Sequence, residues 1–267
     1  MRFLYTTDLH GDSRKYDAIY KYATKNDIKY IHLGADLLPK GNQILRNQKK
    51  FLKGYFKKFY QKCSDSGIKV FAMFGNDDIY TRKKYFEEYG KLLDKDPETI
   101  DGFTFTGYPF VPDYPFGLVT ACKYDYDGWQ PQLYLGKKVD VDESGFVDIP
   151  DPLTYFNYKG TIKDDLSKIS ADSNTIIAIH CPPVNLGMDI CLDGRRVGSK
   201  SVYEWIEEEQ PRLVLCGHIH ESRYMSGTWK DKIGLSTIIQ PGQYGSSTYA
   251  VVIDLNDTGD HYKSVIL

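Results

Sequence analysis

The sequence predicts an α/β protein in which two β-sheets pack face to face and helices cover their outer sides. Three observations support this prediction. Short apolar runs alternate with helical stretches in the first part of the chain, as they do in parallel sheets. Further short apolar runs follow in the second half, at closer spacing. Polar residues stand directly after several of these runs, where ligands of open α/β sheets bind.

The first half predicts three buried parallel strands joined by two helices. Each strand is a four- or five-residue apolar run, at residues 3–7, 30–33 and 70–74. His32 alternates into the second run and is predicted to lie in the core. The helices are expected at residues 13–25 and 42–62, with Ser13 as a cap of the first. This order of strands and helices predicts right-handed crossovers.

The second half predicts more strands and fewer helices. Strands are expected at residues 103–107, 117–120, 175–180, 213–216, 233–239 and 249–254. A helix at residues 201–209 separates two of them and ends at Gln210-Pro211. Because the last strands follow one another closely, the second sheet is predicted to be mostly antiparallel.

Residues 108–158 differ from the rest of the chain. They are rich in proline and tyrosine, contain Trp129 and show poor periodicity. Linkers are rarely this aromatic, so the segment is predicted to be an aromatic-rich insertion within a single domain of residues 1–267. Its rings could stack on a nucleobase or pack the segment onto the body of the protein.

Composition narrows the functional classes. The net charge is −2 and the isoelectric point about 6.3, which gives no basic footprint for long nucleic acid. There is no run of about 20 apolar residues for a membrane span, and the N-terminus reads directly into a strand. The five cysteines are odd in number and lack zinc-ribbon spacing. We therefore expect a cytoplasmic protein without a membrane partner.

Five short polar elements recur at the ends of apolar runs. They are Asp8-Leu9-His10, Gly34-Ala35-Asp36, Gly75-Asn76-Asp77-Asp78, His180 and Gly217-His218-Ile219-His220. Each alone is compatible with an ordinary turn. Together they contain four of the six histidines, with carboxylates and one amide. These ligand types at strand ends predict a site for a pair of divalent transition-metal ions.

The five elements resemble the pattern of the calcineurin-like metallophosphoesterase superfamily, D-x-H, G-D, G-N-H-(D/E), H and G-H-x-H. The stretch from Pro182-Pro183 to Trp205 is similar to small prokaryotic-type members. The resemblance implies a four-layer sandwich of helices, sheet, sheet and helices. It also implies two ion sites with the ligands Asp8, His10 and His220 for one ion, Asn76, His180 and His218 for the other, and Asp36 as the bridge.

The implied activity is hydrolysis of a phosphomonoester or phosphodiester. Two ions of Mn, Fe, Ni or Zn would acidify a water that attacks phosphorus in line. Asp36 and Asp77 are the expected catalytic residues, although Asp77 replaces the histidine that usually follows Gly-Asn. It could orient a water or a partner histidine, or the leaving group could need little help. Because no arginine follows Asp36, a phosphoprotein phosphatase is disfavoured.

Arg195 and Arg196 are the predicted substrate contacts, since guanidinium groups match phosphate oxygens. A solvated surface loop is the alternative for them. The expected partner is a small phosphoester, and the sequence leaves the oligomeric state open. Two other functions stay open as well. One is a non-catalytic scaffold with the same fold that binds proteins, and the other is a metal-dependent nuclease, which the lack of a basic stripe disfavours.

Overall fold

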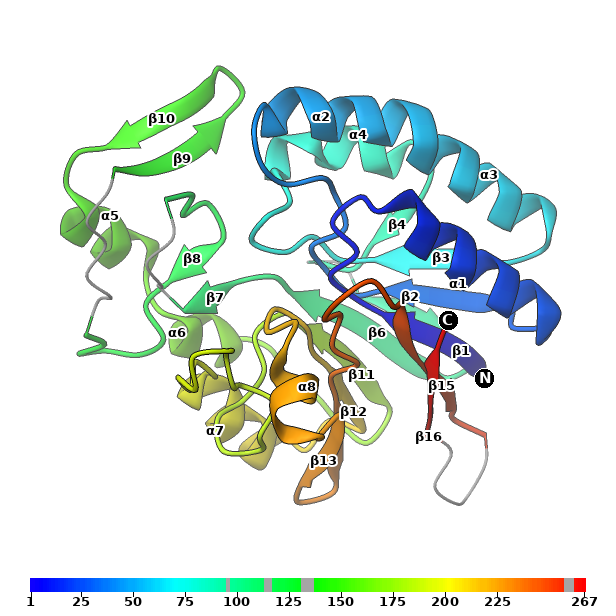
Figure 1. Ribbon diagram of the computed structural model, residues 1–267. Helices are drawn as coiled ribbons and strands as arrows, with labels where there is room; N and C mark the ends of the chain where they lie inside the picture. Colours follow the sequence, from blue (N-terminus) through cyan, green and yellow to red (C-terminus); the bar gives the residue numbers. More distant parts are fainter. Residues whose placement is uncertain (95–96, 113–116, 131–136, 257–261) are drawn as a thin grey trace.

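The computed structural model describes residues 1–94, 97–112, 117–130, 137–256 and 262–267. Two six-stranded mixed sheets form its centre (Figure 1). The strands of the first sheet, in spatial order, are β16 (Tyr262–Ile266), β15 (Tyr249–Asp254), β1 (Arg2–Thr6), β2 (Tyr30–Leu33), β3 (Lys69–Ala72) and β4 (Lys91–Leu92). Those of the second are β13 (Lys230–Ile233), β14 (Ser236–Ile239), β12 (Leu213–Leu215), β11 (Thr175–Ile179), β6 (Phe103–Tyr108) and β5 (Glu98–Ile100).

Helices cover the outer face of each sheet. The first sheet carries α1 (Ser13–Lys25), α2 (Ile44–Phe51), the π-helix η1 (Leu52–Phe56), α3 (Lys57–Asp65), the 3₁₀-helix η2 (Tyr80–Arg82) and α4 (Lys83–Glu87). The second carries α6 (Ile162–Leu166), α7 (Lys200–Glu209) and α8 (Ser222–Ser226) on its side of the molecule (Figure 1). The protein is therefore the predicted four-layer α/β/β/α sandwich.

Three hydrophobic clusters separate the four layers. Strand alternation explains them, because successive side chains point to opposite faces. In β1, Leu4 packs toward the helices, whereas Phe3 and Tyr5 pack between the sheets. In β11, Ile177 packs toward α7, whereas Ile176 packs between the sheets. Both sheets are thus buried on two sides, which accounts for their nearly continuous apolar runs.

The prediction that the second sheet is mostly antiparallel was wrong. β6, β11, β12 and β14 are all parallel, and only the edge strands β5 and β13 are antiparallel to their neighbours in the described parts of this sheet. Close spacing of strands misled the prediction. The expected strand at 233–239 is in fact a hairpin, because Gly234 adopts a left-handed φ of +57° and separates β13 from β14.

Smaller differences concern helix ends and the insertion. Asp12, not Ser13, caps α1, because its carboxylate accepts the backbone N–H of Arg14. The helix expected at 42–62 is interrupted by η1. Residues 117–120, all of them described, form no strand; Leu118 makes only an isolated bridge to Val139.

The predicted insertion contains two small sheets and a helix, and its residues 113–116 and 131–136 lie outside the described residues. The sheets pair β7 (Val111–Pro112) with β8 (Cys122–Lys123), and β9 (Lys138–Asp142) with β10 (Gly145–Ile149). The helix is α5 (Pro152–Lys159), and the segment forms the green lobe of Figure 1. No helix within the described ranges is both long and apolar enough to cross a bilayer. The five cysteines, all within the described residues, form no disulfide with one another.

Candidate metal centre

Five parallel strands deliver all seven predicted ligands to one edge of the sandwich. Asp8 and His10 follow β1, Asp36 follows β2, and Asn76 follows β3. From the second sheet, His180 follows β11, and the pair His218 and His220 follows β12. Because these strands run parallel within each sheet, their carboxyl ends share an edge, where such folds bind ligands.

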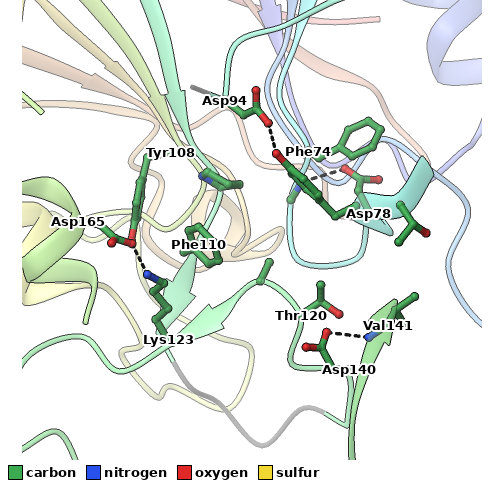
Figure 2. Close-up of a pocket in the computed structure, with 15 residues that line it drawn as sticks. Phe74, Asp78, Asp94, Tyr108, Phe110, Thr120, Lys123, Asp140, Val141 and Asp165 are labelled. Atoms are coloured by element: carbon green, nitrogen blue, oxygen red, sulfur yellow. Dashed lines mark hydrogen bonds and ion pairs between the residues drawn. The ribbon is translucent and has the colours of Figure 1, made fainter. Parts of the chain in front are cut away.

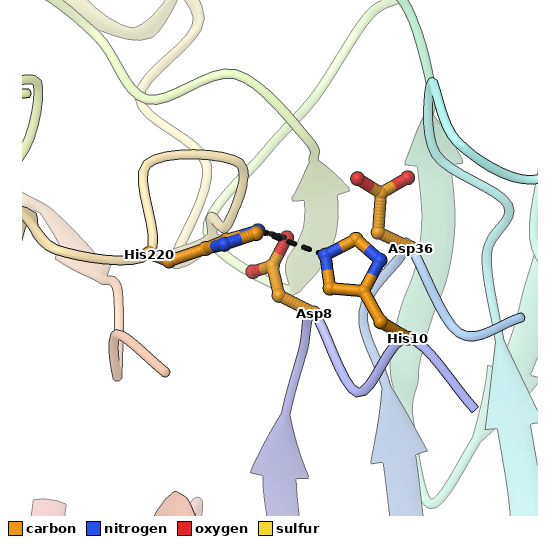
Figure 3. A group of neighbouring side chains, drawn as sticks. All are labelled: Asp8, His10, Asp36 and His220. Atoms are coloured by element: carbon orange, nitrogen blue, oxygen red, sulfur yellow. Dashed lines mark hydrogen bonds and ion pairs between the residues drawn. The ribbon is translucent and has the colours of Figure 1, made fainter. Parts of the chain in front are cut away.

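The first group contains Asp8, His10, Asp36 and His220, whose candidate ligand atoms lie within 4.8 Å of one another. The Nε2 atoms of His10 and His220 are 2.9 Å apart. His220 Nε2 also lies 3.4 Å from Oδ1 of Asp8. Figure 3 shows the two imidazole rings and the two carboxylates side by side, with Asp8 and His10 on one loop and Asp36 and His220 on two others. Four candidate metal-ligand side chains thus lie close enough together to share one ion.

The second group contains His180 and His218 and shares Asp36 with the first. His180 Nε2 lies 3.4 Å from Oδ2 of Asp36 and 3.0 Å from Oδ1 of Asn76. The ring centroids of His180 and His218 are 5.0 Å apart. The two groups therefore share one carboxylate, as a bridged pair of sites requires, and each set matches the ligand set that the motifs imply.

The spacing of the donors suits divalent ions. Two imidazole nitrogens that bind one tetrahedral zinc at about 2.0–2.1 Å stand roughly 3.3 Å apart. The observed separations of 2.9 and 3.4 Å around His220 are close to this value. Nitrogen and oxygen donors together suit Mn, Fe, Ni or Zn and disfavour an all-oxygen ion such as Ca²⁺. The residues present therefore fit a pair of transition-metal ions.

Four of the seven residues have a left-handed backbone. The φ angles are +56° at Asp8, +45° at His10, +49° at Asp36 and +70° at His218. Only nine non-glycine residues in the described parts of the chain have positive φ. Such conformations cost of order 1–3 kcal/mol each and concentrate at functional sites. Sharp turns directly after the strands explain how the side chains reach inward.

Hydrogen bonds between the loops hold these turns in place. The backbone N–H of Asp8 donates to Ala35 O, and that of His10 donates to Asp36 O. The N–H of His218 donates to both carboxylate oxygens of Asp8, at 3.1 and 3.2 Å. Gln240 follows β14, and its Nε2 donates to the carbonyl of Ile219, between the last two histidines. The backbone geometry is thus fixed by the protein itself.

Burial and mutual charge shift the pKa values of these groups. Burial lowers the pKa of His10 to about 4 and that of His218 to about 3, which favours the neutral, ligating form. Burial opposes the charge of His180 too, but the Asp36 carboxylate outweighs it and raises the pKa of His180 to about 9. Burial would likewise raise the pKa of Asp36, yet His180 holds it well below its usual range. Asp36 therefore carries its negative charge at neutral pH.

A comparison with protein families decides what kind of site this is. The family model for calcineurin-like phosphoesterases matches residues 1–222, which include all seven residues. The chain belongs to the calcineurin-like phosphoesterase family. The family assignment agrees with the resemblance that the five motifs suggested.

The individual proteins that the chain resembles share only part of its sequence or a low identity with it. An uncharacterized protein of Methanocaldococcus jannaschii is 39% identical over 90 residues, which span 30% of this chain and 39% of that protein. The crystal structure of a protein of Thermus thermophilus superposes with a TM-score of 0.57 at 16% identity, covering 99% and 97% of the two chains. Another solved structure gives 0.61 at 13% identity, covering 100% and 98%. At such identities these structures establish the shared fold alone.

Asp77, the second expected catalytic residue, lies beside the candidate metal centre. Its Oδ2 is 3.7 Å from Nδ1 of His10, and its backbone N–H donates to Asp36 Oδ1 at 2.8 Å. Burial raises the pKa of Asp77 to about 7, and the Asp36 carboxylate contributes to the rise. The carboxylate therefore faces the ring edge of His10 opposite the nitrogen that meets His220.

The predicted substrate contacts lie in the loop before α7. Nε of Arg195 is 2.7 Å from Asp193, and Nη1 of Arg196 is 3.2 Å from the buried Asp189. Both side chains are more than half exposed. The loop is anchored next to His220, because the N–H of Leu192 donates to Glu221. The structure thus brings the loop near the centre but pairs both guanidinium groups with carboxylates of that loop.

Two supporting residues had no assigned role from the sequence. The buried Asp78 accepts the backbone N–H groups of Leu37, Leu38 and Gly75, which ties the loop after β2 to the loop after β3. The buried Gln48 donates to the carbonyl of Asp77 at 2.6 Å and accepts the N–H of Ile79. Asp78 belongs to the Gly-Asn-Asp-Asp run and was recognisable there. Gln48 carried no local signal, since it lies on a helix.

Proposed function

We propose that this chain is a hydrolase of small phosphomonoesters or phosphodiesters that works with two divalent metal ions. Asp8, His10 and His220 would hold one ion, Asn76, His180 and His218 would hold the other, and Asp36 would belong to both sites. One observation carries the proposal, namely the convergence of seven ligand-type side chains from five strand ends. A scaffold that had lost catalysis would be free to lose ligands, whereas this chain retains a competent donor at every position.

The protein side chains divide the work. Bound divalent ions would supply a water of lowered pKa and neutralise charge on the phosphoryl oxygens. Asp36 belongs to both ligand groups; its Oδ2 faces His180 in the second group, and its Oδ1 accepts the Asp77 N–H. Asp77 Oδ2 lies 3.7 Å from Nδ1 of His10, beyond hydrogen-bond distance, and would orient His10 by moving closer to this nitrogen, in the manner of carboxylates that position ligating histidines elsewhere. Arg195 and Arg196 would contact the phosphate by leaving Asp193 and Asp189.

The experiment is metal removal and restoration. The protein is stripped with a chelator, and Mn, Ni, Zn or Mg is restored separately before assay with p-nitrophenyl phosphate and bis(p-nitrophenyl) phosphate. We expect hydrolysis with at least one transition-metal ion and none in the stripped protein. Absence of hydrolysis of both substrates with every ion would overturn the proposal and favour the protein-binding scaffold.

A matched pair of variants controls for backbone effects. Asp36→Asn removes the bridging charge at a left-handed residue with φ of +49°. Asp101→Asn makes the same change at an exposed residue with φ of +52°, and asparagine tolerates this conformation as aspartate does. We expect the Asp36 variant to lose activity and ion binding, and the Asp101 variant to retain both.

A further inference from the structure

A cavity of about 550 Å³ lies next to the metal centre and has no part in holding ions. Its walls come from the carboxyl ends of β3, β4 and β6 and from the insertion (Figure 2). The metal-ligand residues follow β1, β2 and β3 in the first sheet and β11 and β12 in the second. The cavity therefore continues the same edge, one strand further along each sheet. Its volume lies within the roughly 300–1,000 Å³ typical of small-molecule sites.

The cavity and the metal centre share a wall. Gly75 lines the cavity, and a Cβ on this residue would lie 2.3 Å from Oδ1 of Asp36. Tyr108, on the opposite side, accepts the backbone N–H of His180 on its carbonyl at 3.1 Å. The cavity therefore borders the loops that carry Asp36 and His180, and the alcohol part of an ester bound at the ions would reach it past Gly75.

The insertion forms the outer side of the cavity. Thr120, Lys123, Asp140 and Val141 line it from β8, β9 and the preceding loop. The insertion is also anchored to the helices of the first sheet, since Lys84 of α4 pairs with Glu143 of the β9–β10 turn at 3.1 Å. The cavity is consequently specific to how this segment of the chain packs.

The walls combine aromatic rings with carboxylates. Tyr80, Tyr108 and Phe110 contribute rings, and the ring centroids of Tyr108 and Phe110 are 5.6 Å apart. Among the described lining residues, four carboxylates face a single cation, Lys123. Asp94 accepts a hydrogen bond from the hydroxyl of Tyr80, and Asp165 accepts one from the hydroxyl of Tyr108. A carboxylate has about four lone-pair positions, so capacity to accept hydrogen bonds remains.

Two hydroxyl groups in the walls have no hydrogen-bond partner among the residues that the structure describes. Oγ1 of Thr81 and Oγ1 of Thr120 are both buried and unsatisfied, and both residues line this cavity. Buried polar groups are normally paired, so an orphaned one calls for a ligand or a water. One hydroxyl comes from η2 and the other from the insertion. Both oxygens are shielded from solvent in this structure, so a polar ligand in the cavity would satisfy them after rotation of the threonine side chains about χ1.

We propose that this cavity binds the alcohol part of the phosphoester, and that this part is an uncharged, ring-bearing group of nucleoside size with hydroxyl or amino donors. The inference rests on the proposed function of the metal centre. Rings in the walls stack on a flat group, and the carboxylates accept its donors. The excess of negative charge rejects alcohols that carry further phosphates, because Lys123 pairs with Asp165 and Lys83 with Asp94, which leaves Asp140 and the buried Asp78 without a paired cation among the described residues.

Two variants test the cavity without touching the ions. Thr120→Val keeps the shape of the side chain and removes a hydroxyl that has no partner in the described part of the chain. Ala121→Phe fills the cavity from the same segment. Thr99→Val, on the exposed face of the edge strand β5, is the matched control. The readout is the ratio of kcat/KM for adenosine 5′-phosphate to kcat/KM for methyl phosphate. If the wild type hydrolyses only diesters, adenosine 5′-phosphate and methyl phosphate are each replaced by their methyl diester.

We expect the wild type to prefer the nucleoside ester. Thr120→Val should lower the ratio about threefold to tenfold, as loss of one hydrogen bond does. Ala121→Phe should lower it more than about tenfold, because a filled cavity excludes the ring altogether. Thr99→Val should leave it unchanged. A wild-type ratio near one, or equal losses on both esters in the two cavity variants, would overturn the inference.

Binding of adenosine to the metal-free protein, measured by calorimetry, separates this inference from the proposed function. If hydrolysis fails with every ion but adenosine binds and Ala121→Phe abolishes the binding, the cavity assignment stands and the proposed function falls. If hydrolysis occurs but adenosine neither binds nor inhibits, the proposed function stands and the cavity assignment falls.

Discussion

Replacing Gly75 with alanine tests the metal centre by a steric route that changes no ligand. Gly75 lies between β3 and Asn76, and its φ is outside the left-handed region, so alanine is conformationally acceptable there. A Cβ at this position would lie 2.3 Å from Oδ1 of Asp36 and 2.8 Å from its backbone nitrogen. The added methyl therefore presses on the residue that is proposed to bridge the two ions.

The size of the effect follows from these distances. Ordinary contact begins at 3.4 Å, so Asp36 or the loop after β3 must move by about 1.1 Å. Metal–ligand distances tolerate changes of only about 0.2 Å. A displacement of reacting groups by about 1 Å costs on the order of 100-fold in rate, or about 2.7 kcal/mol of transition-state stabilisation. We expect Gly75→Ala to lower kcat/KM by roughly that factor.

The assay compares two measurements on each protein. One is kcat/KM with a nitrophenyl ester at saturating metal ion, and the other is the rise in Tm that the ion produces, which reports its affinity. Gly54→Ala in η1 is the control, because no described atom lies within 4 Å of its would-be Cβ. That variant should keep full activity and gain up to about 1 kcal/mol of stability from reduced backbone freedom.

The steric reasoning would be refuted if Gly75→Ala retained wild-type kcat/KM and the same ion-induced rise in Tm. A variant with lowered Tm in the absence of ions but an unchanged ion-induced rise would locate the strain in the fold and not in the metal centre. Loss of both activity and the ion-induced rise is the expected result.

Two further predictions concern residues with contrasting environments. Burial lowers the pKa of His32 to about 3, and neither ring nitrogen has a partner among the described residues, which here include Phe3, Tyr5 and Phe105. As the pH falls below about 6.5, His32 therefore becomes protonated in the unfolded state before it does so in the folded state. Between about pH 7.5 and 5, the wild type should lose about 2 kcal/mol of unfolding free energy relative to His32→Leu, as measured by urea unfolding. A difference between the two proteins that does not change with pH would contradict this. Asp77→Ala should weaken ion affinity about tenfold if Asp77 orients a ligating histidine. Unchanged affinity and hydrolysis in both Asp77→Ala and Asp77→His would remove Asp77 from the mechanism.

Local sequence predicted β1, β2, β3 and β15 of the first sheet but missed its edge strands β4 and β16, and it predicted the strand directions of the second sheet wrongly. The helix at residues 13–25 and the strand at 30–33 have the expected bounds because their periodicity and end signals are local. The direction of β14 depends on where the chain runs after β12, through α8 and the β13 hairpin. No sequence pattern within residues 233–239 predicts the course of the chain between these strands. Gly234, with its left-handed φ, indicates only a local turn.

The sequence by itself determined the order and chemistry of the candidate ligands. Asp8, Asp36 and His180 each follow an apolar run, and parallel strands must bring such positions to one edge. This follows from short-range order, in which hydrophobic periodicity and residue type are sufficient.

Only the tertiary structure decided which donors meet and what surrounds them. The left-handed turns, the sharing of Asp36 between two groups, the pairing of Arg195 and Arg196 with nearby carboxylates, and the cavity beneath the insertion all arise from contacts between distant segments. Such contacts depend on packing in three dimensions, because a side chain's neighbours across two sheets leave no period or spacing in the chain.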